Sequence, residues 1–197
     1  MRPEAIHQAK ERLKRAEAAY ARLVNSRNLD AIESAWSDFL FAASGIYSKL
    51  EKGSKGHGPS EGWFGRMKRY RKDDALLSYV HHARNAEEHG IAAITQREAG
   101  FLGVSGDVVM SGTLGPGGKL TVTGIPGGRP PAITVKDPRV KLIAVTDDRY
   151  GDVFEVPTTH LGLPLDDPSP DRVAGMALTY LRTLIADGAK FIPPPRH

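Results

Sequence analysis

The hydrophobic periodicity of the chain changes once, near Gly100, and this change limits the possible folds more than any other feature. Before it, apolar residues recur every three or four positions, as on one face of an α-helix. After it, they form short runs separated by turns rich in glycine and proline. The pattern predicts an α+β protein: an N-terminal antiparallel helical bundle over residues 1–100, then a small antiparallel β-sheet with a C-terminal helix over residues 101–197.

In the first half, the periodicity predicts one helix over residues 4–25 and a second that follows Asn28, a good N-cap. A short connection between them favours antiparallel packing. The glycines between residues 53 and 62 predict a mobile loop. A short helix is expected over residues 63–72, followed by a longer one that is capped by Asp73 or Asp74 and extends towards Ile94.

In the second half, short runs typical of strands predict the small sheet. They cover residues 107–112, 119–125, 132–136, 140–146 and 152–156. The last helix is expected to begin at Ser169 with Pro170 in its first turn, to end at Gly188 and to pack on the sheet.

The composition excludes several classes of protein. The 197 residues contain no cysteine, so disulfides, thiolate metal sites and cysteine nucleophiles are ruled out. No apolar stretch is long enough for a membrane span, and the charged start, MRPEAIHQAKERLKR, is unlike a signal peptide. We therefore expect a cytoplasmic protein that does not associate with membranes.

The net charge of +4 lies entirely in the first half of the chain. Residues 1–100 hold 17 basic and 13 acidic residues, whereas residues 101–197 hold ten of each. Five cations and Tyr70 are concentrated in one short segment: Arg66, Lys68, Arg69, Arg71 and Lys72. This composition predicts either a phosphate-binding patch or a solvated basic turn.

The segment from Asp74 to Ile91, DALLSYVHHARNAEEHGI, carries the residues with the greatest chemical capability. His81, Asn85 and His89 follow at steps of one helical turn and form one polar stripe, with Arg84 beside it. An imidazole can move a proton while a guanidinium holds a phosphate and stabilises its developing charge. The stripe therefore predicts metal-independent phosphodiester chemistry without a cofactor. A metal site formed by His81, His82 and His89 is an alternative that lacks a recognised ligand motif.

Arg84-Asn85-Ala86-Glu87-Glu88-His89 resembles the signature of the HEPN superfamily, which is an Arg, usually a polar residue next, and a His after four to six intervening positions. Arg2 and His7 have the same spacing, but no Asn follows Arg2. The resemblance covers about residues 1–100. It implies an endoribonuclease that acts as a homodimer, in which the helices that carry the motif meet at the interface and form one cleft.

In the mechanism that this resemblance implies, the ribose 2′-hydroxyl attacks the adjacent phosphate. His89 is the general acid or base, Arg84 stabilises the transition state and Asn85 orients the substrate by hydrogen bonding. We expect His81, Lys68, Arg69 and Arg71 to bind the RNA. The implied role is a toxin or phage-defence effector, with an antitoxin or another protein as a further partner. Two alternatives stay open: a non-catalytic RNA-binding or assembly module, and a structural dimer whose sheet half recruits a partner protein.

Overall fold

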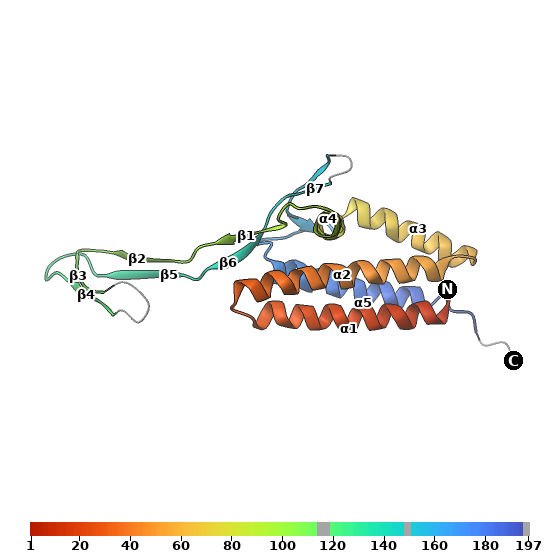
Figure 1. The fold of residues 1–197 in the computed structure, drawn as a ribbon, viewed down its shortest axis with the longest axis horizontal. Coiled ribbons are helices and arrows are strands. Elements are labelled where there is room, and N and C mark those ends of the chain that lie inside the picture. The colour runs from red at the N-terminus through yellow and green to blue at the C-terminus, as the bar shows by residue number, and fades with distance from the viewer. Residues whose placement is uncertain (114–118, 148–150, 195–197) are drawn as a thin grey trace. The chain divides into compact units, whose positions relative to one another are not determined.

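The computed structural model describes residues 1–113, 119–147 and 151–194 (Figure 1). Its fold is α+β, as the sequence predicts. The chain divides into two compact units, which are Met1–Gln96 with Val140–His197, and Arg97–Arg139. We call the first the helical unit and the second the ribbon unit. This division does not follow the predicted boundary at residue 100, because the chain after residue 139 returns to the helices.

Helices α1 (Pro3–Asn25) and α2 (Leu29–Ser54) pack side by side in antiparallel directions (Figure 1). Buried alanines on α1 allow the two backbones to approach closely. The Asn28 side chain accepts a hydrogen bond from Ala31 N at 3.0 Å, which confirms the predicted N-cap. The centre of the core is formed by the large apolar side chains of α2, which are fully buried: Trp36, Phe39, Leu40, Ile46 and Leu50.

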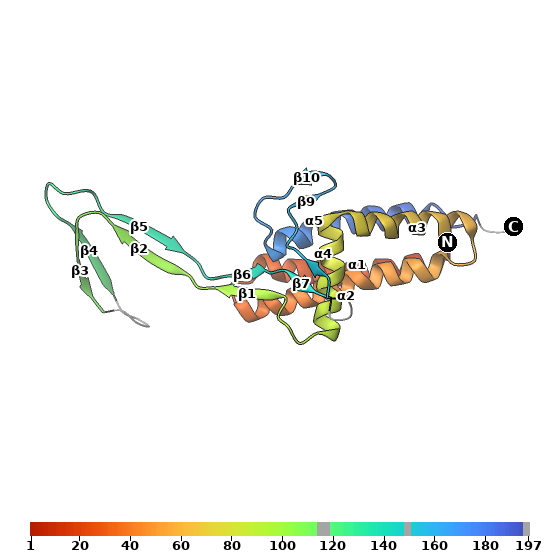
Figure 2. The ribbon, with the colours of Figure 1, turned by 90° about the horizontal axis from the view of Figure 1, so that it is seen from above.

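The last helix, α5 (Pro170–Ala189), lies against α1 and α2 (Figure 2). The prediction of its bounds is confirmed to within a residue, but the prediction that it packs on the sheet is wrong. Its apolar face joins the same core as the first two helices, with Val173, Leu178 and Leu181 fully buried. The apolar face of α5 is wider than a short two-stranded sheet. It therefore packs on the helical bundle, which offers an apolar surface of similar width.

Helix α3 (Gly58–Asp73) includes the second half of the segment that was predicted to be a mobile loop. Only residues 55–57 separate it from α2. Ser60 explains the difference, because its fully buried hydroxyl donates a hydrogen bond to Ser54 O at 3.0 Å and fixes the first turn. Pro59 also suits a first turn, where its missing N–H is not needed.

Helix α4 (Ala75–His89) begins at the N-cap Asp74, which accepts from Leu77 N at 2.9 Å. It ends before the predicted extension to Ile94, since Gly90 adopts an extended conformation while its N–H still bonds Ala86 O at 2.8 Å. Ile94 is nonetheless buried, whereas Ile91 is fully exposed.

The strands form two-stranded pairs within the described residues, in place of the single small sheet that was predicted. β1 (Thr95–Glu98) pairs with β6 (Arg139–Leu142). In the helical unit, β7 (Val145–Thr146) pairs with β8 (Val153–Phe154), and β9 (Thr159–His160) pairs with β10 (Leu163–Pro164), both antiparallel. Leu142, Val145 and Leu165 connect these strands to the helical core.

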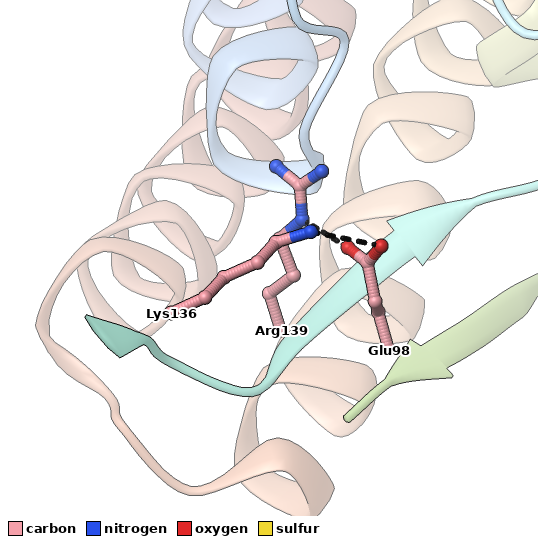
Figure 3. Close-up of polar contacts among 3 residues, drawn as sticks. All are labelled: Glu98, Lys136 and Arg139. Carbon is pink, nitrogen blue, oxygen red and sulfur yellow. Dashed lines mark hydrogen bonds and ion pairs between the residues drawn. The ribbon is translucent and has the colours of Figure 1, made fainter. Parts of the chain in front are cut away.

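The ribbon unit consists of two antiparallel pairs, β2 (Phe101–Ser105) with β5 (Ala132–Lys136), and β3 (Val108–Gly112) with β4 (Leu120–Gly124). Near its start, Glu98 binds Lys136 at 3.0 Å and Arg139 at 2.6 Å (Figure 3). In the described part of the chain, no helix combines the length and the apolar composition that crossing a membrane requires.

Candidate functional site at the end of helix α4

Helix α4 is held in the helical unit through one apolar face, which leaves its polar stripe on the other side. Leu76, Tyr79 and Ala83 of this face are fully buried. The Tyr79 hydroxyl also donates to Ile143 O at 2.8 Å, and burial raises the pKa of this phenol. The helix therefore offers a rigid support for the predicted site residues.

Two of the three predicted catalytic residues meet at one carboxylate. Arg84 Nη1 forms an ion pair with Glu88 Oε2, and His89 Nε2 lies 3.2 Å from the same oxygen. Arg84 Nη1 also donates to Asn85 Oδ1 at 3.3 Å. The Arg84 side chain is 23% exposed and that of His89 is 69% exposed. The structure thus brings Arg84, Asn85 and His89 together at the open end of α4, with Glu88 between the guanidinium and the imidazole.

Helix α2 forms one wall of this site. The Arg84 guanidinium lies over the ring of Phe41, 5.5 Å from its centroid. Ser37 donates to Glu87 Oε1 at 2.6 Å and ties the last turn of α4 to α2. Arg84 Nε is buried and has no hydrogen-bond partner among the described residues. The guanidinium therefore has a fixed position, and its Nε, which is buried, does not face a ligand.

The predicted basic patch is not one surface. Lys68 pairs with Glu51 of α2 at 3.1 Å, and Arg69 is exposed. Arg71 turns inward and lies over the Tyr47 ring, 4.6 Å from its centroid, and burial lowers its pKa. Arg71 therefore serves packing between α3 and α2, whereas Arg69 is available to a ligand.

His81 lies deeper than the rest of the stripe. With Tyr47 and Arg71, it lines a cavity of about 20 Å³, which is room for about one water molecule. Burial, followed by the positive charges of Arg71, His82, Arg84 and Lys72, lowers the pKa of His81 to about 3. His81 is therefore neutral at physiological pH, and its imidazole adds no positive charge to a phosphate-binding surface.

His82 of α4 contacts the part of the chain that follows the ribbon unit. Its ring stacks on Phe154 at a centroid distance of 3.4 Å, and its Nδ1 lies 3.8 Å from Asp147 Oδ2. The rings of His81 and His82 are 5.0 Å apart. However, no three His, Asp or Glu side chains within residues 1–113, 119–147 and 151–194 form a group that could hold a metal ion.

A second polar contact, between Asp74 and His160, escaped the sequence analysis. Asp74 Oδ1 lies 3.0 Å from His160 Nδ1, and Asp74 Oδ2 accepts from Leu161 N at 2.7 Å. Both side chains are at least 93% buried. Because 86 residues separate them, no local pattern could pair them. Asp74 thus fixes the start of the helix that carries the site.

In comparisons with known proteins, no family model, no curated protein and no solved structure matches this chain. The chemistry of the site therefore has to be argued from its geometry. A fixed guanidinium, an exposed imidazole and an amide at the end of one helix can bind an oxyanion and move a proton beside it.

Proposed function

We propose that the protein is a cytoplasmic, metal-independent endoribonuclease of the HEPN type. The observation that carries the proposal is the convergence of Arg84 and His89 on a single anionic oxygen, Glu88 Oε2. A phosphate oxygen carries the same kind of charge and accepts the same hydrogen bonds. An RNA phosphate that replaces the Glu88 carboxylate would be held by both residues at once.

The reaction follows from these three side chains. The neutral imidazole of His89 accepts the proton of a ribose 2′-hydroxyl, whose oxygen attacks the adjacent phosphorus. Arg84 binds the non-bridging oxygens and stabilises the charge that develops on them, while Asn85 orients the phosphate. The bond to the 5′-oxygen breaks, and that oxygen takes up the proton that His89 received. The products are a 2′,3′-cyclic phosphate and a 5′-hydroxyl end.

Displacing Glu88 requires little free energy. Its ion pair with Arg84 joins residues four positions apart on a partly exposed helix, and such pairs contribute about 0.2–0.5 kcal/mol. A phosphate that binds Arg84 and His89 together gains more than this, since a hydrogen bond to a charged group contributes about 1.5–3 kcal/mol. Glu88 therefore acts as a weak competitor that occupies the site in the absence of RNA.

A homodimer through α4 forms part of the proposal. Phe41 and Ile91 flank the site and are exposed in the single chain, at 41% and 107%. Apolar side chains beside a polar site are typical of a surface that a partner covers. Two copies of α4 that meet there would place two sets of Arg84 and His89 in one cleft, and the same face would serve an antitoxin.

The test is cleavage of mixed-sequence single-stranded RNA by the purified protein in excess EDTA. We expect R84A and H89A, with folds verified by circular dichroism, to lose at least about a hundredfold in rate. The matched control is H7A, because the exposed His7 belongs to the second Arg–His pair with the same spacing. If the wild type leaves RNA intact, or if R84A and H89A cut as fast as H7A, the catalytic proposal is wrong.

The pairing of Arg84 with both Glu88 and Asn85 favours one alternative, a non-catalytic RNA-binding module. Such a module retains affinity for RNA that falls steeply with salt concentration. Arg69 and Lys72 are exposed, so R69A and K72A should each lower the salt dependence by about one unit of slope. If the protein binds RNA with this salt dependence but does not cleave it, the RNA-binding module is the correct function. If the affinity for RNA does not change with salt concentration, neither the ribonuclease nor the RNA-binding module is correct.

A further inference from the structure

Helices α2, α3, α4 and α5 all contact one another around the cavity that His81 lines. The apolar part of its wall comes mainly from α4 and α5, and the polar part comes from α2, α3 and α4. The polar side chains are those of Ser44, Tyr47, Arg71 and His81. We call this space the four-helix cavity. It lies within the helical unit, and its volume of about 20 Å³ admits one water molecule or one small ion.

Tyr47 carries a polar group that no described protein atom satisfies. The residue is 8% exposed, and its hydroxyl is buried without a hydrogen-bond partner among the described residues. The neighbouring phenol of Tyr180 donates instead to Met67 Sδ at 4.0 Å. Buried polar side chains in native proteins almost always have a partner, and where no protein group supplies it, a bound water or ion does. Tyr47 therefore indicates an occupant of the four-helix cavity.

Arg71 favours an anion over water as this occupant. Its side chain is partly buried, its Nε has no hydrogen-bond partner, and no carboxylate of the described residues forms an ion pair with it. The two acids whose charges act on this region have other partners: Glu51 pairs with Lys68 at 3.1 Å, and Asp74 contacts His160 at 3.0 Å. Because a buried charge without a partner is costly, an anion stabilises Arg71 more than a neutral water does.

The rest of the wall is also suited to an anion. The neutral imidazole of His81 has one N–H that can donate, and the positive charges of Arg71, Arg84 and Lys72 act on it. Ser44 adds a hydroxyl, and within the described part of the chain no carboxylate lines the cavity. The wall therefore offers donors and no negative charge that would repel an anion. The volume excludes polyatomic anions such as phosphate and leaves a halide ion as the class that fits.

We propose that the four-helix cavity binds one monatomic anion of the size of chloride, held by Arg71, Tyr47 and His81. The ion neutralises the guanidinium and accepts hydrogen bonds from the phenol and the imidazole. Since α2, α3 and α4 each supply one of these groups, the ion ties the three helices together, one helical turn before Asn85 of the candidate site. This anion site does not depend on the ribonuclease proposal.

The first test is urea unfolding in mixtures of sodium chloride and sodium gluconate at constant ionic strength. Gluconate is too large for the cavity, so it shows only the general effect of salt. The variant R71Q is compared with R66Q, which removes the same charge from an exposed position on α3. We expect chloride to raise the unfolding midpoint of the wild type and R66Q and to leave that of R71Q unchanged. An equal response of R71Q and R66Q, or no response of the wild type, overturns the proposal.

A milder variant provides the test if R71Q does not fold. Y47F keeps the ring beneath Arg71 and removes only the hydroxyl, whereas its matched control Y70F removes the hydroxyl of an exposed tyrosine. A hydrogen bond to a charged group corresponds to about a tenfold change in affinity or more. Y47F should therefore need at least about tenfold more chloride for half of the stabilisation, and Y70F should match the wild type. Equal behaviour of Y47F and Y70F contradicts the proposal.

The position of the ion can be tested with bromide, which resembles chloride and scatters X-rays anomalously. Crystals of the wild type soaked in sodium bromide should show an anomalous peak between Arg71, Tyr47 and His81, and crystals of Y47F should show a weaker one. Bromide found only elsewhere on the protein would be an adventitious ion only, and this result overturns the proposal. None of these measurements involves RNA, so their failure would leave the proposed function intact.

Discussion

Replacing Asp74 with alanine should destabilise the helical unit more than any other single change at a polar residue described above. The carboxylate receives three contacts, from Leu77 N at 2.9 Å, Leu161 N at 2.7 Å and His160 Nδ1 at 3.0 Å. Losing an N-cap costs about 1 kcal/mol. Each of the other two hydrogen bonds to the carboxylate contributes about 1–2 kcal/mol, which includes the cost of the polar group that is left unpaired. We expect a total loss of about 3–5 kcal/mol for D74A.

The matched control is the neighbouring residue. Asp73 is exposed and lies in the last turn of α3, where a negative charge is unfavourable, so D73A should change the free energy of unfolding by no more than about 0.5 kcal/mol. Urea unfolding followed by circular dichroism at pH 7 measures both variants. If D74A and D73A differ by less than about 1 kcal/mol, the reasoning from these contacts is refuted.

The pH dependence provides a second check on Asp74. Burial raises the pKa of this carboxyl, but the hydrogen bonds from Leu161, Leu77 and His160 outweigh burial and hold the pKa below 3.8. The unfolded chain therefore binds the proton first as the pH falls. The stabilisation by Asp74 is complete well above pH 3.8 and is lost below it. The difference between the wild type and D74A should accordingly shrink as the pH falls below about 4.

Three further predictions concern other contacts. A Cβ at Gly53 would lie 2.2 Å from Ala5 Cβ, so G53A should destabilise the α1–α2 pair by about 1–3 kcal/mol in urea unfolding despite its better helix propensity; an unchanged midpoint would refute this packing. E88Q removes the competing charge and should raise RNA affinity about twofold or more in a filter-binding assay, whereas E87Q, which can still accept from Ser37, should not. Because the pKa of His81 is about 3 in the folded chain, against an ordinary value of 6.5 for histidine, the unfolded state gains a proton first, and the wild type should lose stability as the pH falls from about 6.5. H81Q should lose less over the same range in urea titrations, and equal losses would contradict the burial of a neutral imidazole.

The sequence predicts those parts of the fold that local periodicity and capping determine. The α1 and α2 stripes, the Asn28 cap and the bounds of α5 are all confirmed. Strands β3, β4 and β5 also lie where short β-prone runs were found. The short, polar β1 was missed because strands of four residues carry almost no periodic signal.

The remaining features depend on contacts between distant residues. The packing of α5 on α1 and the pairing of Asp74 with His160 cannot be deduced from spacing. Composition alone also could not show that Arg71 faces Tyr47 while Arg69 faces solvent, since both occur in one basic run. At the candidate site, the sequence predicted which residues share the end of α4 but not that Glu88 lies between Arg84 and His89. Their catalytic role stays a prediction.

The packing of α5 on α1 has a consequence for synthesis. Arg182 of α5 binds Glu17 of α1 at 2.9 Å, across 165 positions of sequence. While the ribosome is still making the intervening chain, the apolar surface that α5 will cover is open on the first two helices. The helical core can close only after α5 has left the exit tunnel, so a nascent chain that stalls before Pro170 leaves that surface exposed to water.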